Sequence, residues 1–503
     1  MVLSISRRNF IMTAGAAGVG AGLAAPALAA GPRINISRSA ARPDRPNVVV
    51  IVIDTLRRDH LGIYGNRWMR TTALDQLGRQ SLRFTRATPE AMPTIPARRS
   101  IHSGMRTFPF RNWTRRAGNR STVWGWQHIP DDQPTLAEQM AENGYQTMLV
   151  SDVPHEFTPG MNFTRGFNTV QWMRGQEGDP YQPYWSVPDY HLDRYLYRDQ
   201  NGEEITTKLG DTPLSLELRQ YLANTNDRKS EEDHFTARVF RAAARVLENY
   251  PRDKPFFLTV DSFDPHEPWD APRYYVDLYD DPDYADPEPV TPRYGSSDYL
   301  TPRQLQRMRA LYAAEVTLMD HWLGFFMEQL DEQGFLDSTL VILTSDHGMA
   351  LGEHDAVGKP AYALWGEMTD TPFFIRHPNG TGADTASDYF ASTFDIAPTV
   401  LSLAGIAPKT ELQGADLSPH LDGKEGTPRP HFTSGLNDYV WASDKQYTLI
   451  ARNDGSEAKL YDIVADPDQT KDLADERPQD VRRLFDLVVQ DAGGEPLPSY
   501  DEM

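Results

Sequence analysis

The run NVVVIVI at residues 47–53 constrains the fold of this chain more than any other feature. It is short, rich in β-branched side chains and apolar at every position after the first. Such a run is typical of a central strand in a parallel sheet whose two faces are both covered. Similar runs occupy residues 146–150, 255–260 and 339–343, with a shorter candidate at 373–376. We expect these runs to lie side by side in one sheet.

Helical patterns separate the apolar runs. Thr135 is placed to cap a helix within 134–143, and residues 302–333 carry apolar side chains at helical spacing. Strands that alternate with helices predict an α/β fold with its chemistry at the carboxyl ends of the strands. Asp54, Asp261 and Asp346 each come just after an apolar run, where a site of this kind would lie.

Three further regions differ in character from this core. Residues 157–232 are aromatic and irregular, and we interpret them as an insertion or a lid over the site. Residues 270–299 form a second loop, acidic and rich in Pro and Tyr. After about residue 405 short β-like pieces at 447–451 and 458–463 lead to a helix at 478–490. We expect residues 406–503 to form a smaller C-terminal α+β domain.

The N-terminus has the pattern of an export signal. Arg7 and Arg8 precede a short apolar stretch that ends in Ala27-Leu28-Ala29, an A-x-A cleavage pattern of the twin-arginine type. A membrane anchor is the alternative, but Gly and Pro interrupt the stretch. We predict a signal peptide at 1–29, a leader at 30–46, and a periplasmic or secreted protein that is soluble after signal removal, since no later run is long enough to span a membrane.

Charge and the lack of cysteine exclude several functions. The formal net charge of −21 disfavours nucleic acid as a partner, because an acidic chain repels phosphate backbones. The chain has no Cys, which excludes disulfides, Cys-ligated zinc, iron–sulfur clusters and thiol nucleophiles. An anionic substrate would need a local cluster of Arg, Lys or metal.

Four segments carry residues suited to chemistry. Asp54, and Asp346 with His347, offer oxygen and nitrogen ligands at strand ends. Thr94 stands four residues before Arg98 at an apparent helix start, which would place a hydroxyl nucleophile beside an anion clamp. His266 lies in a Pro-rich loop after the run 255–260 and is a candidate acid. Each segment also has a simpler interpretation, as a helix cap or a structural histidine.

Taken together and in order, these segments resemble the sulfatase family of the alkaline phosphatase superfamily. The resemblance covers residues 47 to about 474. Its motifs are NVVVIVIDTLRRDHLGIYG (47–65), TIPARRSIHSG (94–104), PHEP (265–268), TLVILTSDHG (339–348), GEHDAVGK (352–359), DIAPTVLSLAG (395–405) and LYDIVAD (460–466). The resemblance implies a large mixed sheet sandwiched by helices over 47–405, followed by a smaller C-terminal antiparallel sheet.

The resemblance also implies roles for individual residues. Asp54, Asp346 and His347, with the Thr94 oxygen, would bind one divalent metal, and Thr94 occupies the nucleophile position. Arg98 matches the arginine that steadies nucleophile and substrate oxygens. Further matches lie near the leaving group and the bound anion: His266 and Lys359. His354 has no clear partner, and we include it with Lys359 and Asp152 among the candidate substrate-binding residues.

Departures from the family pattern bear on the reaction. True sulfatases carry Cys or Ser at the Thr94 position and oxidise it to formylglycine, whose two geminal hydroxyls attack sulfur and then expel sulfate. Threonine has one hydroxyl and a methyl, so the covalent intermediate must be displaced directly. Asp152 stands where typical sulfatases place a sulfate-binding lysine, which favours a monoanionic substrate. Alternatively, Asp152 points away and the region 157–232 supplies the contacts to the substrate. Thr55 replaces a second aspartate ligand, which shifts the expected ion from Ca²⁺ toward Mn²⁺ or Zn²⁺.

These features lead to one main hypothesis and three alternatives. We expect a metal-dependent hydrolase that cleaves a small anionic ester, a phosphodiester or a phosphonate monoester, through a covalent Thr94 intermediate. The alternatives are a sulfuric ester hydrolase that works without formylglycine, a phospho-group transferase, and a substrate-binding protein that kept the fold but lost turnover.

Overall fold

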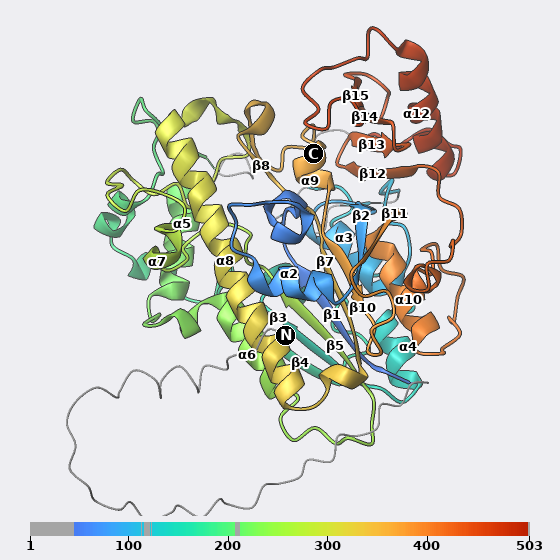
Figure 1. Ribbon diagram of the computed structural model, residues 1–503. Helices are drawn as coiled ribbons and strands as arrows, with labels where there is room; N and C mark the ends of the chain where they lie inside the picture. The colour runs from blue at the N-terminus through green and yellow to red at the C-terminus, as the bar shows by residue number, and fades with distance from the viewer. Residues whose placement is uncertain (1–44, 112, 115–120, 122, 207–211, 501–503) are drawn as a thin grey trace, which may run out of the picture. The chain divides into compact units, whose positions relative to one another are not determined.

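Strand β1, Asn47–Ile53, lies inside an eight-stranded sheet in the computed structural model of the protein (Figure 1). The structure describes residues 45–111, 113–114, 121, 123–206 and 212–500. The predicted signal peptide, and the predicted leader except for residues 45 and 46, lie outside the described residues. Within the described part, no helix is both long and apolar enough to cross a membrane.

The sheet is mixed, with a parallel centre. Its strand order is β11-β2-β10-β7-β1-β5-β3-β4. The strands are β2 (Leu82–Ala87), β3 (Gln146–Ser151), β4 (Thr169–Trp172), β5 (Phe256–Ser262), β7 (Thr339–Ser345), β10 (Phe373–Arg376) and β11 (Thr385–Ala391). β1 pairs in parallel with β5 and β7, while β10 runs antiparallel to β7 and β2. All five predicted strands are confirmed.

Helices cover both faces of this sheet, as predicted. Alternate side chains of β1 point to opposite faces, so Val49 and Ile51 join one core cluster and Val48 and Val50 join another. The first cluster packs under α2 (Thr72–Arg79), α6 (Phe235–Arg245) and α8 (Pro302–Glu332). The second packs under α3 (Thr94–Ser103), α4 (Leu136–Glu142) and α10 (Ile396–Leu403). Burial of both faces explains the unbroken apolar run of β1.

Two predicted helices have the expected ends. Thr135 forms a capping box with Glu138, whose backbone N–H donates to the Thr135 hydroxyl at 3.1 Å while the Thr135 N–H donates to the Glu138 carboxylate at 2.8 Å. The long helix α8 ends one residue before the predicted limit of residue 333. Figure 1 shows α8 crossing the molecule beside α6 and α2.

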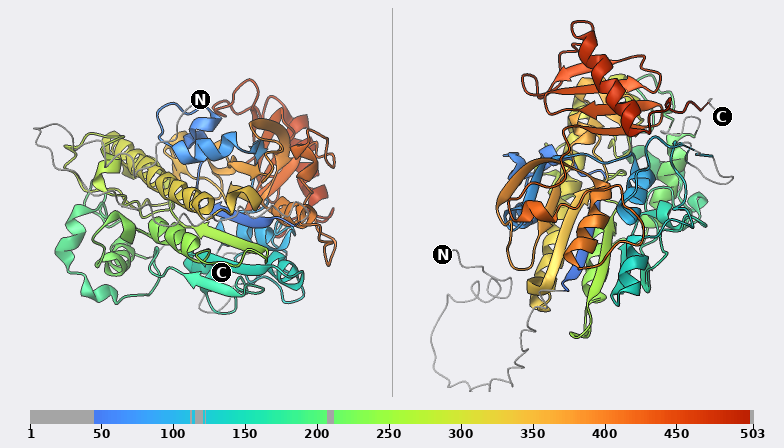
Figure 2. Two further views of the ribbon diagram at one scale, coloured as in Figure 1. Left: turned by 60° about the horizontal axis from the view of Figure 1, so that its bottom comes forward. Right: turned by 90° about the vertical axis from the view of Figure 1, so that its right-hand side faces the viewer.

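The C-terminal part forms a separate antiparallel sheet covered by a helix, which confirms the expected α+β character. The sheet has the order β12-β13-β14-β15, with β12 at Phe432–Leu436, β13 at Tyr439–Ser443, β14 at Tyr447–Arg452 and β15 at Lys459–Asp462. Helix α12, Pro478–Asp491, packs Leu484 and Val488 on one face of it (Figure 2).

The region 157–232 is less irregular than expected. Its residues Thr169–Trp172 form β4, which pairs in parallel with β3 at the edge of the main sheet. Leu214–Thr225 forms α5, where Leu214, Leu218 and Tyr221 make a buried face at helical spacing. The expectation of an irregular segment is therefore wrong at these two places. None of the four β4 side chains is buried, so this strand lacks an apolar run.

Candidate active site

The candidate site lies at the carboxyl ends of the central strands. Asp54 directly follows β1, and Asp346 and His347 directly follow β7. Ile53 is the register partner of Ser345, so the three side chains leave the sheet next to one another. All three are fully buried. Parallel pairing thus gathers, at one edge of the sheet, residues that are far apart in the sequence.

These three side chains fit a divalent cation. Two carboxylate oxygens, from Asp54 and Asp346, and an imidazole nitrogen of His347 lie within 4.8 Å of one another. Nδ1 of His347 is 2.9 Å from the carbonyl of Gly348, which places the proton on Nδ1 and leaves the lone pair of Nε2 toward the carboxylates. Within the described part of the chain, Asp54 Oδ2 and His347 Nε2 are buried without a hydrogen bond.

The protonation state of His347 agrees with a ligand role. Burial, together with the positive charge of Lys359, lowers the pKa of His347 to about 3. The imidazole is therefore neutral at physiological pH, the form that binds a metal. Two carboxylates and a neutral imidazole are the donors that Mn²⁺ or Zn²⁺ accepts, and Ca²⁺ favours oxygen ligands instead.

Thr55 orients both carboxylates. Its hydroxyl donates to Asp54 Oδ1 at 2.6 Å, and its backbone N–H donates to Asp346 Oδ1 at 3.0 Å. The residue adopts a φ of 61°, a left-handed conformation that a β-branched side chain rarely takes. Where many sulfatases have a second aspartate ligand, this chain therefore places a residue that supports the two remaining carboxylates.

Arg98 lies at the centre of three carboxylates. Its guanidinium binds Asp261 through Nε and Nη2 at 2.8 and 2.7 Å, and its Nη1 lies 2.5 Å from Asp346 and 3.1 Å from Asp54. Every one of these side chains is fully buried. Burial opposes the charge of Arg98, but the carboxylates of Asp261, Asp346 and Asp54 hold its pKa well above the usual value.

Thr94 is the first residue of α3, as the sequence predicts. Arg98, one helical turn later, donates from Nη1 to the Thr94 carbonyl at 3.2 Å. This spacing keeps the threonine beside the guanidinium that touches Asp54 and Asp346. Thr94 is only 2% exposed, at the positive end of the helix dipole. The fold therefore brings Thr94, Arg98 and the metal-ligand set together.

His266 lies in a tight turn that follows β5. Its backbone N–H donates to the carbonyl of Phe263 at 2.8 Å, and its imidazole stacks on the Phe263 ring at 4.0 Å between centroids. Nδ1 lies 2.7 Å from the carbonyl of Glu267, which places the proton of the neutral ring on Nδ1. The side chain is 2% exposed, which protects its orientation from water.

The three candidate substrate-binding residues have different surroundings. Lys359 follows a short strand, β9 (Ala356–Gly358), and lies 5.6 Å over the ring of Tyr294. His354 stacks on Trp365 at 4.2 Å between centroids. Asp152 is fully buried, and its carboxylate accepts from protein donors. Only Lys359 is electrostatically coupled to the metal-ligand set, through the pKa of His347.

Two residues of the site's surroundings were not assigned from the sequence. Asp261 has the strand-end position that identified Asp54 and Asp346, but no motif marks it as the partner of Arg98. Gln176 belongs to the aromatic region 157–232 and contacts Asp152 and Asp264 only through the tertiary fold.

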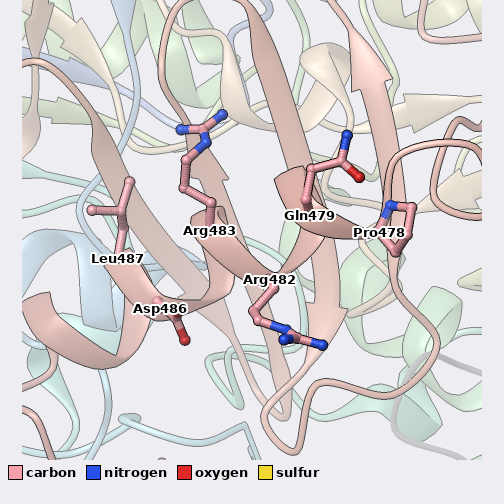
Figure 3. Close-up of a pocket in the computed structure, with 6 residues that line it drawn as sticks. All are labelled: Pro478, Gln479, Arg482, Arg483, Asp486 and Leu487. Carbon is pink, nitrogen blue, oxygen red and sulfur yellow. The ribbon is translucent and has the colours of Figure 1, made fainter.

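The surface hollows of the C-terminal part are separate from this site. One, of about 560 Å³, runs along α12 and is lined by residues between Pro478 and Leu487 (Figure 3). Another, of about 900 Å³, lies between hairpin ends and the C-terminal segment, near Trp124 and Tyr500. Neither hollow is lined by any of the predicted site residues.

The strand ends of the α/β sheet thus carry a buried cluster of two carboxylates and an imidazole, with a threonine and an arginine beside it. This arrangement is consistent with an ester hydrolase. Comparison with known proteins identifies its family. The sulfatase family model matches residues 46–406, and the model for the C-terminal region of N-sulphoglucosamine sulphohydrolase matches residues 352–485. The chain belongs to the sulfatase family.

Individual relatives cover nearly the whole chain. An arylsulfatase of Clostridium perfringens is 24% identical over 484 residues, which is 90% of this chain and 95% of that protein. The multifunctional alkaline phosphatase superfamily protein PehA of Trinickia caryophylli is 25% identical, over 86% of this chain and 91% of that protein. The crystal structure of a phosphonate monoester hydrolase of Agrobacterium radiobacter superposes with a TM-score of 0.67 at 21% identity, over 90% of this chain and 96% of that one. The last likeness is one of fold.

Proposed function

We propose that this ester hydrolase cleaves a phosphodiester or a phosphonate monoester through a covalent intermediate on Thr94. The observation that carries the proposal is a threonine at the first position of α3, beside Arg98 and the Asp54, Asp346 and His347 cluster. A threonine hydroxyl supports a single displacement at phosphorus, followed by displacement at the intermediate. It has no second hydroxyl with which to expel sulfate.

The reaction follows from the positions of the side chains. When bound by Asp54, Asp346 and His347, a divalent cation would neutralise developing negative charge and favour ionisation of a hydroxyl beside it. Thr94 Oγ1 gives up its proton to solvent and attacks phosphorus, an O–P bond forms, and the bond from phosphorus to the leaving oxygen breaks. His266, in its doubly protonated form, gives its Nε2 proton to that oxygen and becomes neutral, with the remaining proton on Nδ1. Water then attacks phosphorus and gives one proton to His266 Nε2, the bond to Thr94 breaks, and Thr94 Oγ1 takes up a proton from solvent, which restores the hydroxyl.

The charges around the site favour a substrate with one negative charge. Arg98 directs its donors to Asp261, Asp346 and the Thr94 carbonyl, so little of its hydrogen-bonding capacity is left for a second anionic oxygen. Lys359 adds a second positive charge that acts on His347. A site whose arginine is engaged by carboxylates of the protein suits a diester or a phosphonate monoester better than a dianionic phosphate. The donor set of two carboxylates and one imidazole favours Mn²⁺ or Zn²⁺ over Ca²⁺ as the resident ion.

A sulfuric ester hydrolase without formylglycine is the second candidate. The family model and the arylsulfatase relative support it, since a sulfate monoester also carries one negative charge. It would use the same Thr94 attack, and release of Thr94 from a sulfate ester would require direct displacement at sulfur.

One panel of substrates distinguishes the two candidates. We would measure metal-dependent release of 4-nitrophenol from a phosphodiester, a phenylphosphonate monoester, a phosphate monoester and a sulfate ester, with the wild type and with Thr94→Ala and Thr94→Ser. We expect turnover of the diester and the phosphonate to exceed that of the sulfate. Thr94→Ala should lower kcat by at least about 1000-fold, and Thr94→Ser should keep most activity.

Two outcomes would contradict the proposal. Faster turnover of the sulfate than of both phosphorus esters would favour the second candidate. Full activity of Thr94→Ala, with unchanged metal content, would remove Thr94 from the mechanism.

A further inference from the structure

A chain of contacts connects the buried Asp152 to the imidazole of His266. Asp152 Oδ1 accepts the backbone N–H of Phe263 at 2.7 Å. The ring of Phe263 stacks on the His266 imidazole, 4.0 Å between centroids and 24° between planes, and its carbonyl accepts the His266 N–H. The position of the imidazole therefore depends on Phe263, and the position of Phe263 depends on the Asp152 carboxylate.

Gln176 links this series of contacts to a second carboxylate, that of Asp264. Its Nε2 donates to Asp264 Oδ1 at 2.5 Å and faces Asp152 Oδ2 at 3.3 Å. The other oxygen of Asp264 accepts the backbone N–H of Thr236, near the start of α6, at 3.0 Å. The exposed fractions are 1% for Gln176, 0% for Asp152 and 6% for Asp264. Gln176 comes from the region 157–232, so this region fixes the turn that carries His266.

We propose that Asp152, Asp264 and Gln176 form a positioning network that holds His266 in line with the leaving oxygen. The inference rests on the proposed function, since it concerns the acid of that reaction. The network gives the acid at position 152 a role inside the protein. Asp152 acts through Phe263 on the geometry of the proton donor and does not need to touch the substrate.

The carboxylates of Asp152 and Asp264 share the Gln176 amide as a donor inside the protein. Ionising both of them therefore costs free energy. Burial raises the pKa of Asp264 to about 6, and burial with the nearby Asp264 raises the pKa of Asp152 well above its usual range. The pair therefore keeps a proton at mildly acidic pH. Other charged or titratable groups around the pair belong to neighbouring segments: Arg228, Asp270, Glu315 and Tyr221. Arg228 lowers the cost of the second negative charge and Asp270 raises it.

The first test replaces the shared donor. Gln176→Leu keeps the size of the side chain and removes its hydrogen bonds, and Gln182→Leu, at an exposed glutamine of the same region, is the matched control. We would measure kcat and KM for phosphodiesters with a good leaving group, 2,4-dinitrophenol, and a poor one, phenol. A misplaced acid should lower kcat for the phenyl ester about 30-fold and for the dinitrophenyl ester less than 3-fold, with KM unchanged.

The leaving-group dependence distinguishes positioning from a structural role. His266→Gln should show the same selective loss, because a good leaving group does not need the proton. Equal loss for both esters in Gln176→Leu, or no loss for either, would overturn the proposal. If Gln176→Leu does not fold, Asp152→Ala and Asp152→Asn replace it. Asparagine keeps an oxygen for the Phe263 N–H, so only Asp152→Ala should lose phenyl ester turnover.

A stability measurement tests the proposed network even if the protein hydrolyses none of these esters. In the folded protein the pKa of Asp264 lies above its unfolded value of 3.8, so stability that is present below pH 3.8 is lost as the pH rises through about 6. Asp152→Asn removes the neighbouring acid and should reduce this loss. The Tm of Asp152→Asn relative to wild type should therefore rise between pH 4.5 and 7.5. The exposed control Asp286→Asn should show no such rise, and the same Tm difference at both pH values for Asp152→Asn would contradict the shared proton.

Discussion

Arg98 offers the sharpest test of how the site is built. It is fully buried, and so are the three carboxylates around it. With a divalent cation at the site, Asp54 and Asp346 have a second positive partner. Asp261 is different, because its two short bonds to Nε and Nη2 of Arg98 are its charge partners in the described part of the chain. Replacing Arg98 with the uncharged Met therefore leaves one buried carboxylate without a counter-charge.

The size of the effect follows from that single carboxylate. Removing one partner of a buried ion pair costs about 3–5 kcal/mol. The carboxylate left behind must stay desolvated or take up a proton, and burial already raises the pKa of Asp261 well above its usual range. The residues that the structure describes correspond to an unfolding entropy of roughly 1 kcal/mol/K, so the loss corresponds to a fall in Tm of about 4 °C. Arg98→Met with Asp261→Asn removes the stranded charge as well. We expect the double variant to regain about 2–3 kcal/mol.

Scanning calorimetry at saturating metal measures the coupling between Arg98 and Asp261 directly. It compares the wild type, both single variants and the double variant. Two results would refute the reasoning. One is a Tm of Arg98→Met within 1 °C of wild type, and the other is a double variant no more stable than Arg98→Met. Activity should be lost in Arg98→Met and in the double variant alike, since the arginine that flanks Thr94 is missing from both.

Three further predictions concern metal, ligand orientation and pH. Dialysis against EDTA should abolish ester hydrolysis. It should also lower the unfolding free energy by about 3 kcal/mol relative to the protein in a metal concentration about 100 times the Kd. Adding the metal back should restore both, and an unchanged Tm after dialysis would argue against a buried metal site. Thr55→Val should raise the metal Kd about 10–100-fold, measured by calorimetric titration, while Thr55→Ser stays close to wild type, because only valine lacks the hydroxyl that donates to Asp54. Burial raises the pKa of Asp320 to about 7 in the folded protein, so the contribution of this residue to stability falls as the pH rises from 3.8 to 7. Asp320→Asn should therefore flatten the decline of Tm over that interval. The same dependence of Tm on pH in the variant and the wild type would contradict this prediction.

The core strands were predictable because both of their faces are covered. A strand such as β1 needs apolar side chains at every position, which leaves a run that periodicity alone can find. β2 and β11, which lie toward one edge of the sheet, carry Arg, Thr, Ser and Asp at exposed or half-exposed positions. Such strands lack a clear apolar pattern, and the sequence did not identify them. β4 was missed because none of its four side chains is buried, so it lacks the apolar run that identified the equally short β10.

The ligand set was predictable for a related reason. Strand ends at one edge of a parallel sheet meet wherever the strands pair, so Asp54, Asp346 and His347 could be grouped without any knowledge of loops. The helical spacing from Thr94 to Arg98 is equally local. Gln176 could not be predicted, because its contact with Asp264 depends on how the region 157–232 folds back on the turn after β5. Side chains that join two loops leave no periodic signal.

For Asp152 the sequence left two interpretations open. An acid that faces the substrate would repel a dianion, whereas an acid that points away would leave the contacts with the substrate to other residues. In the structure the carboxylate accepts the Phe263 N–H and faces Gln176, which are protein partners. Under the proposed function, the preference for one negative charge would then rest on Arg98, whose donors are directed to carboxylates of the protein. An additional arginine at this site, with its donors directed to the substrate, would be expected to admit a dianion.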